Sequence, residues 1–200
     1  YEVRTRIIST WTQLAGHRIR ALYSSYTTQN HEAVKRRRGV SPYRLEIILD
    51  STRLRLEAAI FAALCKALDV LPKERMHQPE RSLPSLERGE MLCDAYAWFR
   101  GEIPAAKLTL EQGLLVLNEL ARGEQIELAP CHSCDDVLLS DRLSHGRSAC
   151  ASCSTTSRRG CAREHATLMR RLSLRNSVSR LLASTRMTIG DSCPWKLSTL

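Results

Sequence analysis

Residues 131–153 read CHSCDDVLLSDRLSHGRSACASC and decide how the C-terminal part of the chain is organised. Two Cys-x-x-Cys pairs, Cys131/Cys134 and Cys150/Cys153, stand fifteen residues apart. Each pair can direct two thiolates at one ion, and a spacer of this length lets the second pair return to the first. Soft thiolates select zinc, and four of them close a tetrahedral shell. The spacing therefore predicts one structural Zn²⁺ held by Cys131, Cys134, Cys150 and Cys153.

The spacer between the two pairs predicts a short hairpin. It holds the apolar run Val137–Leu139, a polar turn near Ser144–Gly146, and a return to Cys150. His132 and His145 are alternative ligands, and in a catalytic site they would be candidate general bases. A catalytic zinc needs an open coordination position, and four cysteines leave none. We therefore expect both histidines to be exposed loop residues and the protein not to be an enzyme.

The composition bounds the remaining possibilities. The chain has 200 residues, 43% of them hydrophobic, and eight cysteines. No apolar run is long enough for a transmembrane helix, and no signal-peptide stretch is visible. Without a secretory signal, the cysteines favour metal binding over disulfides, and Cys65 and Cys93 are expected to be small core residues. We expect a cytoplasmic protein that does not interact with membranes.

The hydrophobic periodicity predicts a mainly α fold with three parts. These are an all-helical body over residues 1–124, a zinc-ribbon-like module over 125–165, and a basic, partly disordered tail over 166–200. Helices are expected over residues 3–14, 17–26, 42–68, 85–101 and 109–123, with a break at Ala15-Gly16, a capping box formed by Thr109 and Gln112, and a strand over 125–128. Residues 27–42 and 72–84 are expected to be irregular connections.

Alanines gather at the centre of the long helix expected over residues 42–68. Ala58, Ala59, Ala62 and Ala63 carry small side chains that would let another helix approach closely. The amount of Leu and Ile around them predicts apolar area that the chain leaves uncovered. We therefore expect this surface to be buried against a partner protein.

The positive charge is unevenly distributed. The net charge is +9; residues 1–130 hold 19 basic and 16 acidic side chains, and residues 131–200 hold 11 and 5. The two helices expected at the N-terminus, joined by a short turn, have the outline of a helix-turn-helix unit. Basic excess beside a zinc module indicates binding to phosphate backbones. The candidate DNA-binding residues are Arg18, Arg20, Lys35, Arg36, Arg37, Arg38, Arg158, Arg159 and Arg163.

These candidates differ in their expected roles. Lys35–Arg38 and the arginines after the zinc module are expected to contact phosphates, whereas Arg18 or Arg20 would read bases. The alternatives are a solvated basic surface without a nucleic-acid partner, and a zinc-ribbon adaptor or RNA-binding module without promoter specificity. The helix-turn-helix outline favours DNA over these alternatives.

The order of these features resembles the FlhC family, the zinc-containing subunits of the bacterial flagellar master regulator. The resemblance rests on Thr12-Gln13-Leu14 with the following RIRALY of residues 18–23, on the helix segment around Ala58–Phe61, and on the cysteine placement within Leu108–Cys153. The KRRRG of residues 35–39 departs from the family's Pro/Gly-rich loop.

The resemblance implies a transcriptional activator subunit that acts in a hetero-oligomer with FlhD. It would bind double-stranded promoter DNA of flagellar genes and help to recruit RNA polymerase. It also implies that the four cysteines of residues 131–153 are zinc ligands.

Overall fold

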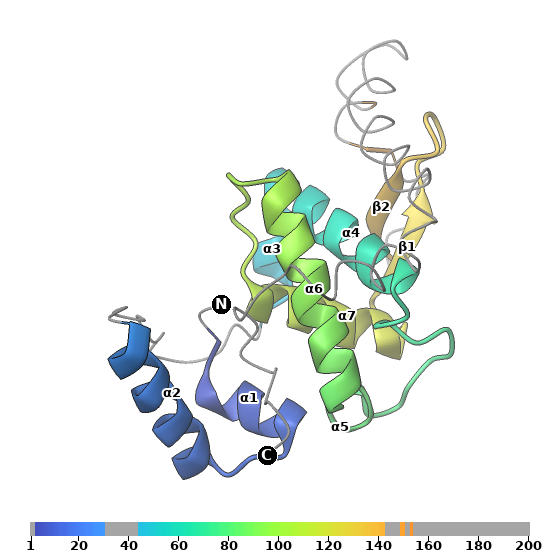
Figure 1. Cartoon of the computed structure of the whole chain (residues 1–200). Coiled ribbons are helices and arrows are strands. Elements are labelled where there is room, and N and C mark those ends of the chain that lie inside the picture. Colours follow the sequence, from blue (N-terminus) through green and yellow to red (C-terminus); the bar gives the residue numbers. More distant parts are fainter. Residues whose placement is uncertain (1–2, 31–43, 143–148, 151–152, 154–200) are drawn as a thin grey trace.

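The computed structural model describes residues 3–30, 44–142, 149–150 and 153. Across these residues the chain forms seven helices and one two-stranded antiparallel sheet (Figure 1). In chain order the elements are α1 (Thr5–Thr12), α2 (Gly16–Asn30), α3 (Glu46–Asp50), α4 (Thr52–Ala67), α5 (Pro79–Ser82), α6 (Leu86–Glu102), α7 (Leu110–Arg122), β1 (Ile126–Pro130) and β2 (Val137–Asp141). The predicted mainly α fold, with a small C-terminal region that carries four cysteines, is confirmed.

The helical body is built around α4, against which α3, α6, α7 and β2 pack. Ala58, Ala59 and Ala62 on α4 are at most 1% exposed, so neighbouring helices do approach this face closely. The neighbours belong to the same chain. Ala58, Ala59 and Ala62 are thus covered by the chain itself, and the predicted contact of this helix and its neighbours with a partner protein stays a prediction for their other surfaces.

An aromatic cluster joins α4 to α6. The Phe61 ring lies 5.7 Å from the Tyr96 ring and 5.6 Å from the Phe99 ring, measured between centroids. The Tyr96 hydroxyl donates a 2.9 Å hydrogen bond to the carbonyl of Leu108, just before α7. Phe61 and Phe99 have no exposed surface. The Phe61 ring is thus held on several sides and has little room to move.

Gly113 is the point on α7 that lies against this ring. A Cβ added at Gly113 would stand 2.5 Å from Phe61 Cε1. We expect Gly113→Ala to lower the free energy of unfolding by about 1–3 kcal/mol, since overpacking of a confined ring outweighs the helix propensity gained. Urea unfolding measures the change. Gly101→Ala on α6 is the matched control, because its Cβ would meet nothing within 4 Å. Equal stability changes in the two variants would contradict this packing.

The helix predicted over residues 42–68 is two helices in the structure. Ser51 lies between α3 and α4 with an extended backbone (φ −90°, ψ 110°). Its hydroxyl accepts a 3.3 Å hydrogen bond from the Leu54 N–H and so caps α4. A serine side chain that bonds to the backbone in this way starts a new helix more readily than it continues an old one. The prediction of a single helix is therefore wrong at Ser51.

Other boundaries also differ from the sequence predictions. Helix α2 continues to Asn30, although residues 27–42 were expected to be an irregular connection. The break between the first two helices falls at Gln13, which has a left-handed backbone (φ 59°), while Gly16 already begins α2. The connection over residues 72–84 contains the short helix α5, which starts at the buried Pro79, a residue suited to a first helical turn. The predicted capping box of Thr109 and Gln112 is confirmed, as is the end of α7 at Gly123, which has φ 65°.

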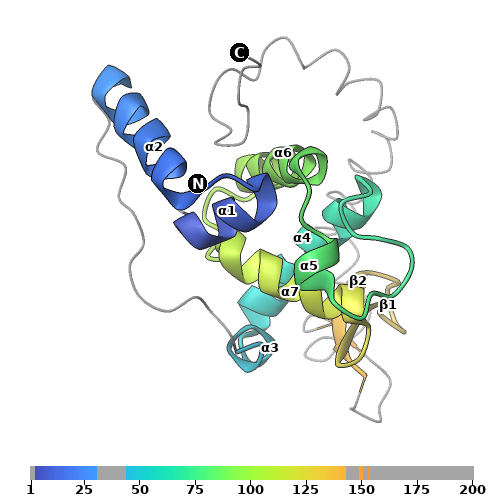
Figure 2. The ribbon, with the colours of Figure 1, turned by 90° about the horizontal axis from the view of Figure 1, so that it is seen from below.

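The N-terminal helices are attached to the body through α1. Ile8 and Trp11 of α1 are buried, and α1 packs on α6 and α2. Before α1, the Arg4 guanidinium pairs with the Glu111 carboxylate, and the Arg4 N–H donates a 2.9 Å hydrogen bond to Glu111 Oε1. The helix α2 lies beyond α1 at the edge of the molecule (Figure 2). The helical body therefore holds α1 in place, and α2 is attached to the body through α1 and lies at its surface.

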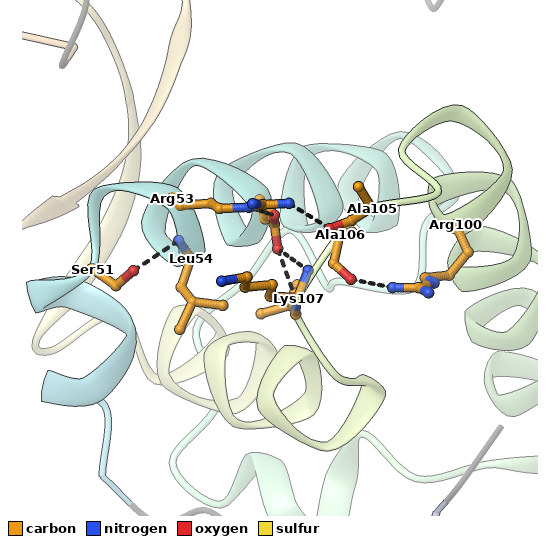
Figure 3. A network of polar contacts seen from close by, with 9 residues as sticks. Ser51, Arg53, Leu54, Arg100, Ala105, Ala106 and Lys107 are labelled. Atoms are coloured by element: carbon orange, nitrogen blue, oxygen red, sulfur yellow. Dashed lines mark hydrogen bonds and ion pairs between the residues drawn. The ribbon is translucent and has the colours of Figure 1, made fainter.

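A second buried carboxylate fastens α4 to the segment before α7. Glu57 Oε2 accepts two 2.8 Å hydrogen bonds from the N–H groups of Lys107 and Leu108, and Glu57 Oε1 accepts one of 2.8 Å from Arg53 Nε. Arg53 also donates to the Ala105 carbonyl (Figure 3). Glu57 is only 4% exposed, so its charge is stabilised by these donors rather than by water.

Candidate metal centre

The first Cys-x-x-Cys pair forms the turn of the β1–β2 hairpin. The Cys131 N–H donates a 2.7 Å hydrogen bond to the Asp136 carbonyl, and the Asp135 N–H donates one of 2.9 Å to the Cys131 carbonyl. Asp135 has a positive φ of 60°, a conformation that Asp tolerates better than most residues. These bonds close a tight turn that brings Cys131 and Cys134 to one side. The adjacent Asp135 and Asp136 are the sequence signal for this turn, and the turn was not among the sequence predictions.

The second pair approaches the first through backbone hydrogen bonds to sulfur. The Cys150 N–H lies 3.3 Å from Cys131 Sγ, and the Cys153 N–H lies 3.3 Å from Cys150 Sγ. Cys131 and Cys150 are buried, while Cys134 and Cys153 are partly exposed. The four predicted cysteines are therefore brought together, with one buried sulfur from each pair.

The sulfur separations fit one metal ion. All four Sγ atoms lie within 4.8 Å of one another, and Cys134 Sγ is 3.7 Å from Cys150 Sγ. A tetrahedral ion with metal–sulfur bonds of about 2.3 Å separates its ligands by about 3.8 Å. A disulfide would need about 2.05 Å. The four cysteines can thus bind a metal ion such as zinc, and the alternative of two disulfides does not fit.

The ionisation of the thiols also points to a cation. Burial alone raises the pKa of the Cys131 thiol, but the backbone N–H groups of Cys150, Ser133 and Cys134 outweigh it and lower this pKa to about 6. Burial, together with the neighbouring sulfurs of Cys131 and Cys153, instead raises the pKa of the Cys134 thiol. The Cys134 thiol thus favours the ionisation of Cys131 while its own ionisation is opposed, and a bound cation would stabilise all the thiolates together.

The two histidines considered as ligands are not part of the described cluster. His132 is exposed, and its Nε2 lies 3.1 Å from the Ser133 hydroxyl. His145 and the predicted turn at residues 144–146 lie outside the described residues. Of the four cysteines outside the cluster, Cys65 and Cys93 are buried core residues as expected, and burial raises the pKa of the Cys65 thiol.

The hairpin that carries the first pair differs from the predicted one. The segment Val137–Leu139 pairs with β1, which precedes the cysteines, with Leu139 opposite Leu128 and Leu138 opposite Ala129. The predicted strand at residues 125–128 is present and extends to Pro130. The apolar run was predicted to belong to a hairpin that turns near residues 144–146 and returns to Cys150, and residues 143–148 lie outside the described residues. The tight turn at Cys131–Asp136 and the pairing with β1 were not predicted.

Both faces of β2 are buried against different surroundings. Leu139 belongs to the main core together with Ile126, whereas Leu138 packs with Cys131 and Cys150. The Arg55 guanidinium of α4 donates a 2.8 Å hydrogen bond from Nε to the Leu139 carbonyl. One face of β2 therefore packs against the helical core, and its other face packs against the cysteine cluster.

The structure describes two of the candidate DNA-binding residues. Arg18 and Arg20 are exposed on α2. Lys35, Arg36, Arg37, Arg38, Arg158, Arg159 and Arg163 lie outside the described residues, as does the predicted tail over 166–200. In Figures 1 and 2, α2 and the β1–β2 hairpin lie at opposite ends of the molecule. Arg18 and Arg20 are thus not gathered with the cysteines.

Within the described part of the chain, no helix combines the length and apolar character needed to cross a bilayer. Comparison of the sequence and the structure with protein-family models, curated proteins and solved structures found no match in any of the three.

Proposed function

We propose that this chain is a DNA-binding transcriptional activator subunit with a structural zinc ion, as its resemblance to the FlhC family implies. The observation that carries the proposal is the charge of the N-terminal helical pair. Residues 3–30 contain four arginines and no acidic residue. Arg4 is paired with Glu111, while Arg6, Arg18 and Arg20 are exposed. An exposed, purely basic helical pair suits a polyanion such as duplex DNA.

In this proposal the zinc ion is structural. Cys131, Cys134, Cys150 and Cys153 would hold it, and its contribution is to fix the hairpin and the chain that follows. Four thiolates fill a tetrahedral shell and leave no position for substrate or water, which supports a protein that is not an enzyme.

The proposed partners are an FlhD-like protein and RNA polymerase. The alanine-rich face of α4 is covered by the chain itself, so a partner has to use other surfaces. Exposed apolar side chains on α3, α4 and α6 are available for such contacts, namely Ile47, Leu56 and Leu86.

Binding to matched nucleic acids tests the proposal. The full chain, co-expressed with an FlhD-like protein, is titrated into duplex DNA and into duplex RNA of the same sequence, with fluorescence anisotropy as the readout. We expect binding to DNA whose log K falls linearly with log salt concentration, because arginines release counterions from phosphates. Absence of DNA binding at low salt would overturn the proposal. Equal or tighter binding to RNA would instead support the RNA-binding module.

A further inference from the structure

The helix α2 is only partly covered by α1, because Leu22 and Tyr26, on the same half of the helix as Ile19, are 42% and 40% exposed. Ile19 is buried and Tyr23 and Thr27 are partly buried, so this side faces α1. Because an α-helix turns by about 100° per residue, His17, Ala21, Ser24 and Thr28 lie within about 40° of the direction opposite Ile19. All four are exposed. We call them the outer face of α2.

Two arginines border the outer face on opposite edges. Arg18 and Arg20 flank Ile19 in the sequence, so each lies about 100° from it around the helix, in opposite senses. Both side chains are exposed. The outer face thus carries His17 and the small side chains of Ala21, Ser24 and Thr28, with one arginine on each edge.

The dimensions of α2 fit the major groove of B-form DNA. Its 15 residues make a rod about 22 Å long, and it stands at the edge of the molecule beyond α1. The groove is about 12 Å wide and admits an α-helix. Alanine, serine and threonine let the helix backbone approach the bases, whereas long side chains would hold it away. The deep, narrow major groove of duplex RNA does not admit a helix in this way.

The polar groups of the outer face suit base edges. The Thr28 hydroxyl donates a 2.8 Å hydrogen bond to the Ser24 carbonyl of its own helix. Its oxygen therefore keeps lone pairs that point away from the helix backbone as acceptors. The amino groups of adenine and cytosine are the donors that the major groove presents to such acceptors.

We propose that α2 enters the major groove of duplex DNA, with its outer face towards the bases and with Arg18 and Arg20 on phosphates of the two flanking strands. This assignment rests on the proposed function. It differs from the expectation that Arg18 or Arg20 reads bases, because both lie on the edges of the outer face. The binding partner of α2 is inferred to be a polyanion, because residues 3–30 carry four arginines and no acidic side chain.

The test separates phosphate contacts from base contacts. Arg18→Gln and Arg20→Gln should each reduce the slope of log K against log salt by about 0.9 and weaken all duplexes alike. Ser24→Ala and Thr28→Ala should leave the slope unchanged and alter the order in which duplexes are selected from a pool with a randomised centre. Arg81→Gln, which removes an exposed arginine from α5, is the charge-matched control and should change neither quantity.

The outcomes distinguish this inference from the proposed function. If the wild-type chain does not bind duplex DNA, both fail. If it binds, but the Arg18 and Arg20 variants keep the wild-type slope, the placement of α2 in the groove is wrong and DNA binding stands. An equal loss of slope in the Arg81 variant would also overturn the placement. All five positions are exposed, so circular dichroism should show unchanged helix content in every variant.

Discussion

Cys150→Ser is expected to abolish tight zinc binding and to loosen the β1–β2 hairpin. Cys150 supplies a buried sulfur that lies 3.7 Å from Cys134 Sγ and accepts a hydrogen bond from the Cys153 N–H, so loss of this sulfur affects both pairs. Structural zinc contributes an apparent binding free energy of about 10–16 kcal/mol in small modules. Plasma mass spectrometry should find a single zinc ion per wild-type chain and almost none in the variant. Hydrogen exchange should become faster at Leu138–Ser140.

His132→Ala is the matched control for this variant. His132 lies inside the same turn but is exposed and is not one of the four clustered residues. The control should keep its zinc and its slow exchange. The helices should persist in the Cys150 variant, because most of their core is formed by α4, α6 and α7. Full zinc occupancy in the Cys150 variant, or zinc loss in the His132 variant, would rule out the four-cysteine site.

Glu57→Ala is expected to destabilise the helical body by about 2–5 kcal/mol. The substitution leaves the buried N–H of Leu108 and the partly buried N–H of Lys107 without their acceptor, and an unsatisfied buried donor costs about 1–3 kcal/mol. It also removes the pairing with Arg53. Urea unfolding followed by circular dichroism measures the loss.

Glu57→Gln separates the hydrogen bonds from the charge. The amide oxygen of glutamine can still accept from Lys107 and Leu108, whereas its amide nitrogen cannot accept from Arg53 Nε. We therefore expect a loss of only about 1 kcal/mol, which reflects the weaker bonds of a neutral acceptor and the lost bond to the exposed Arg53. Similar losses for the alanine and glutamine variants would mean that the charge of Glu57, and not its acceptor geometry, holds this contact.

The sequence predicted the elements whose signals are local. The capping box at Thr109 and the glycine that ends α7 are decided within a few residues, and both are where the sequence placed them. The four cysteines are also brought together, because their spacing limits how the chain can return. The break at Ser51 also had a local signal, but the apolar periodicity on either side of it masked that signal.

What the sequence could not predict depends on contacts between distant residues. The pairing of β2 with β1 was not predicted. The apolar run Val137–Leu139 could pair with the segment before it or with the segment after it, and its composition does not distinguish the two. The buried carboxylates of Glu57 and Glu111 look like surface residues until segments far away in the sequence supply their donors. That the alanines of α4 are covered by helices of the same chain could not be predicted, because hydrophobic periodicity does not say which helix covers a face.

The two-sided burial of β2 restricts which changes of length the chain tolerates. Successive strand residues point to opposite faces, so a shift of β2 by one residue would exchange Leu138 and Leu139. Leu139 would then face the sulfurs, and Leu138 would face the helical core. The connection between the strands cannot absorb an extra residue either, because Cys131 and Cys134 lie within it. A single-codon insertion or deletion between Pro130 and Val137 therefore acts as a core mutation and a metal-site mutation together, although it falls in a hairpin turn.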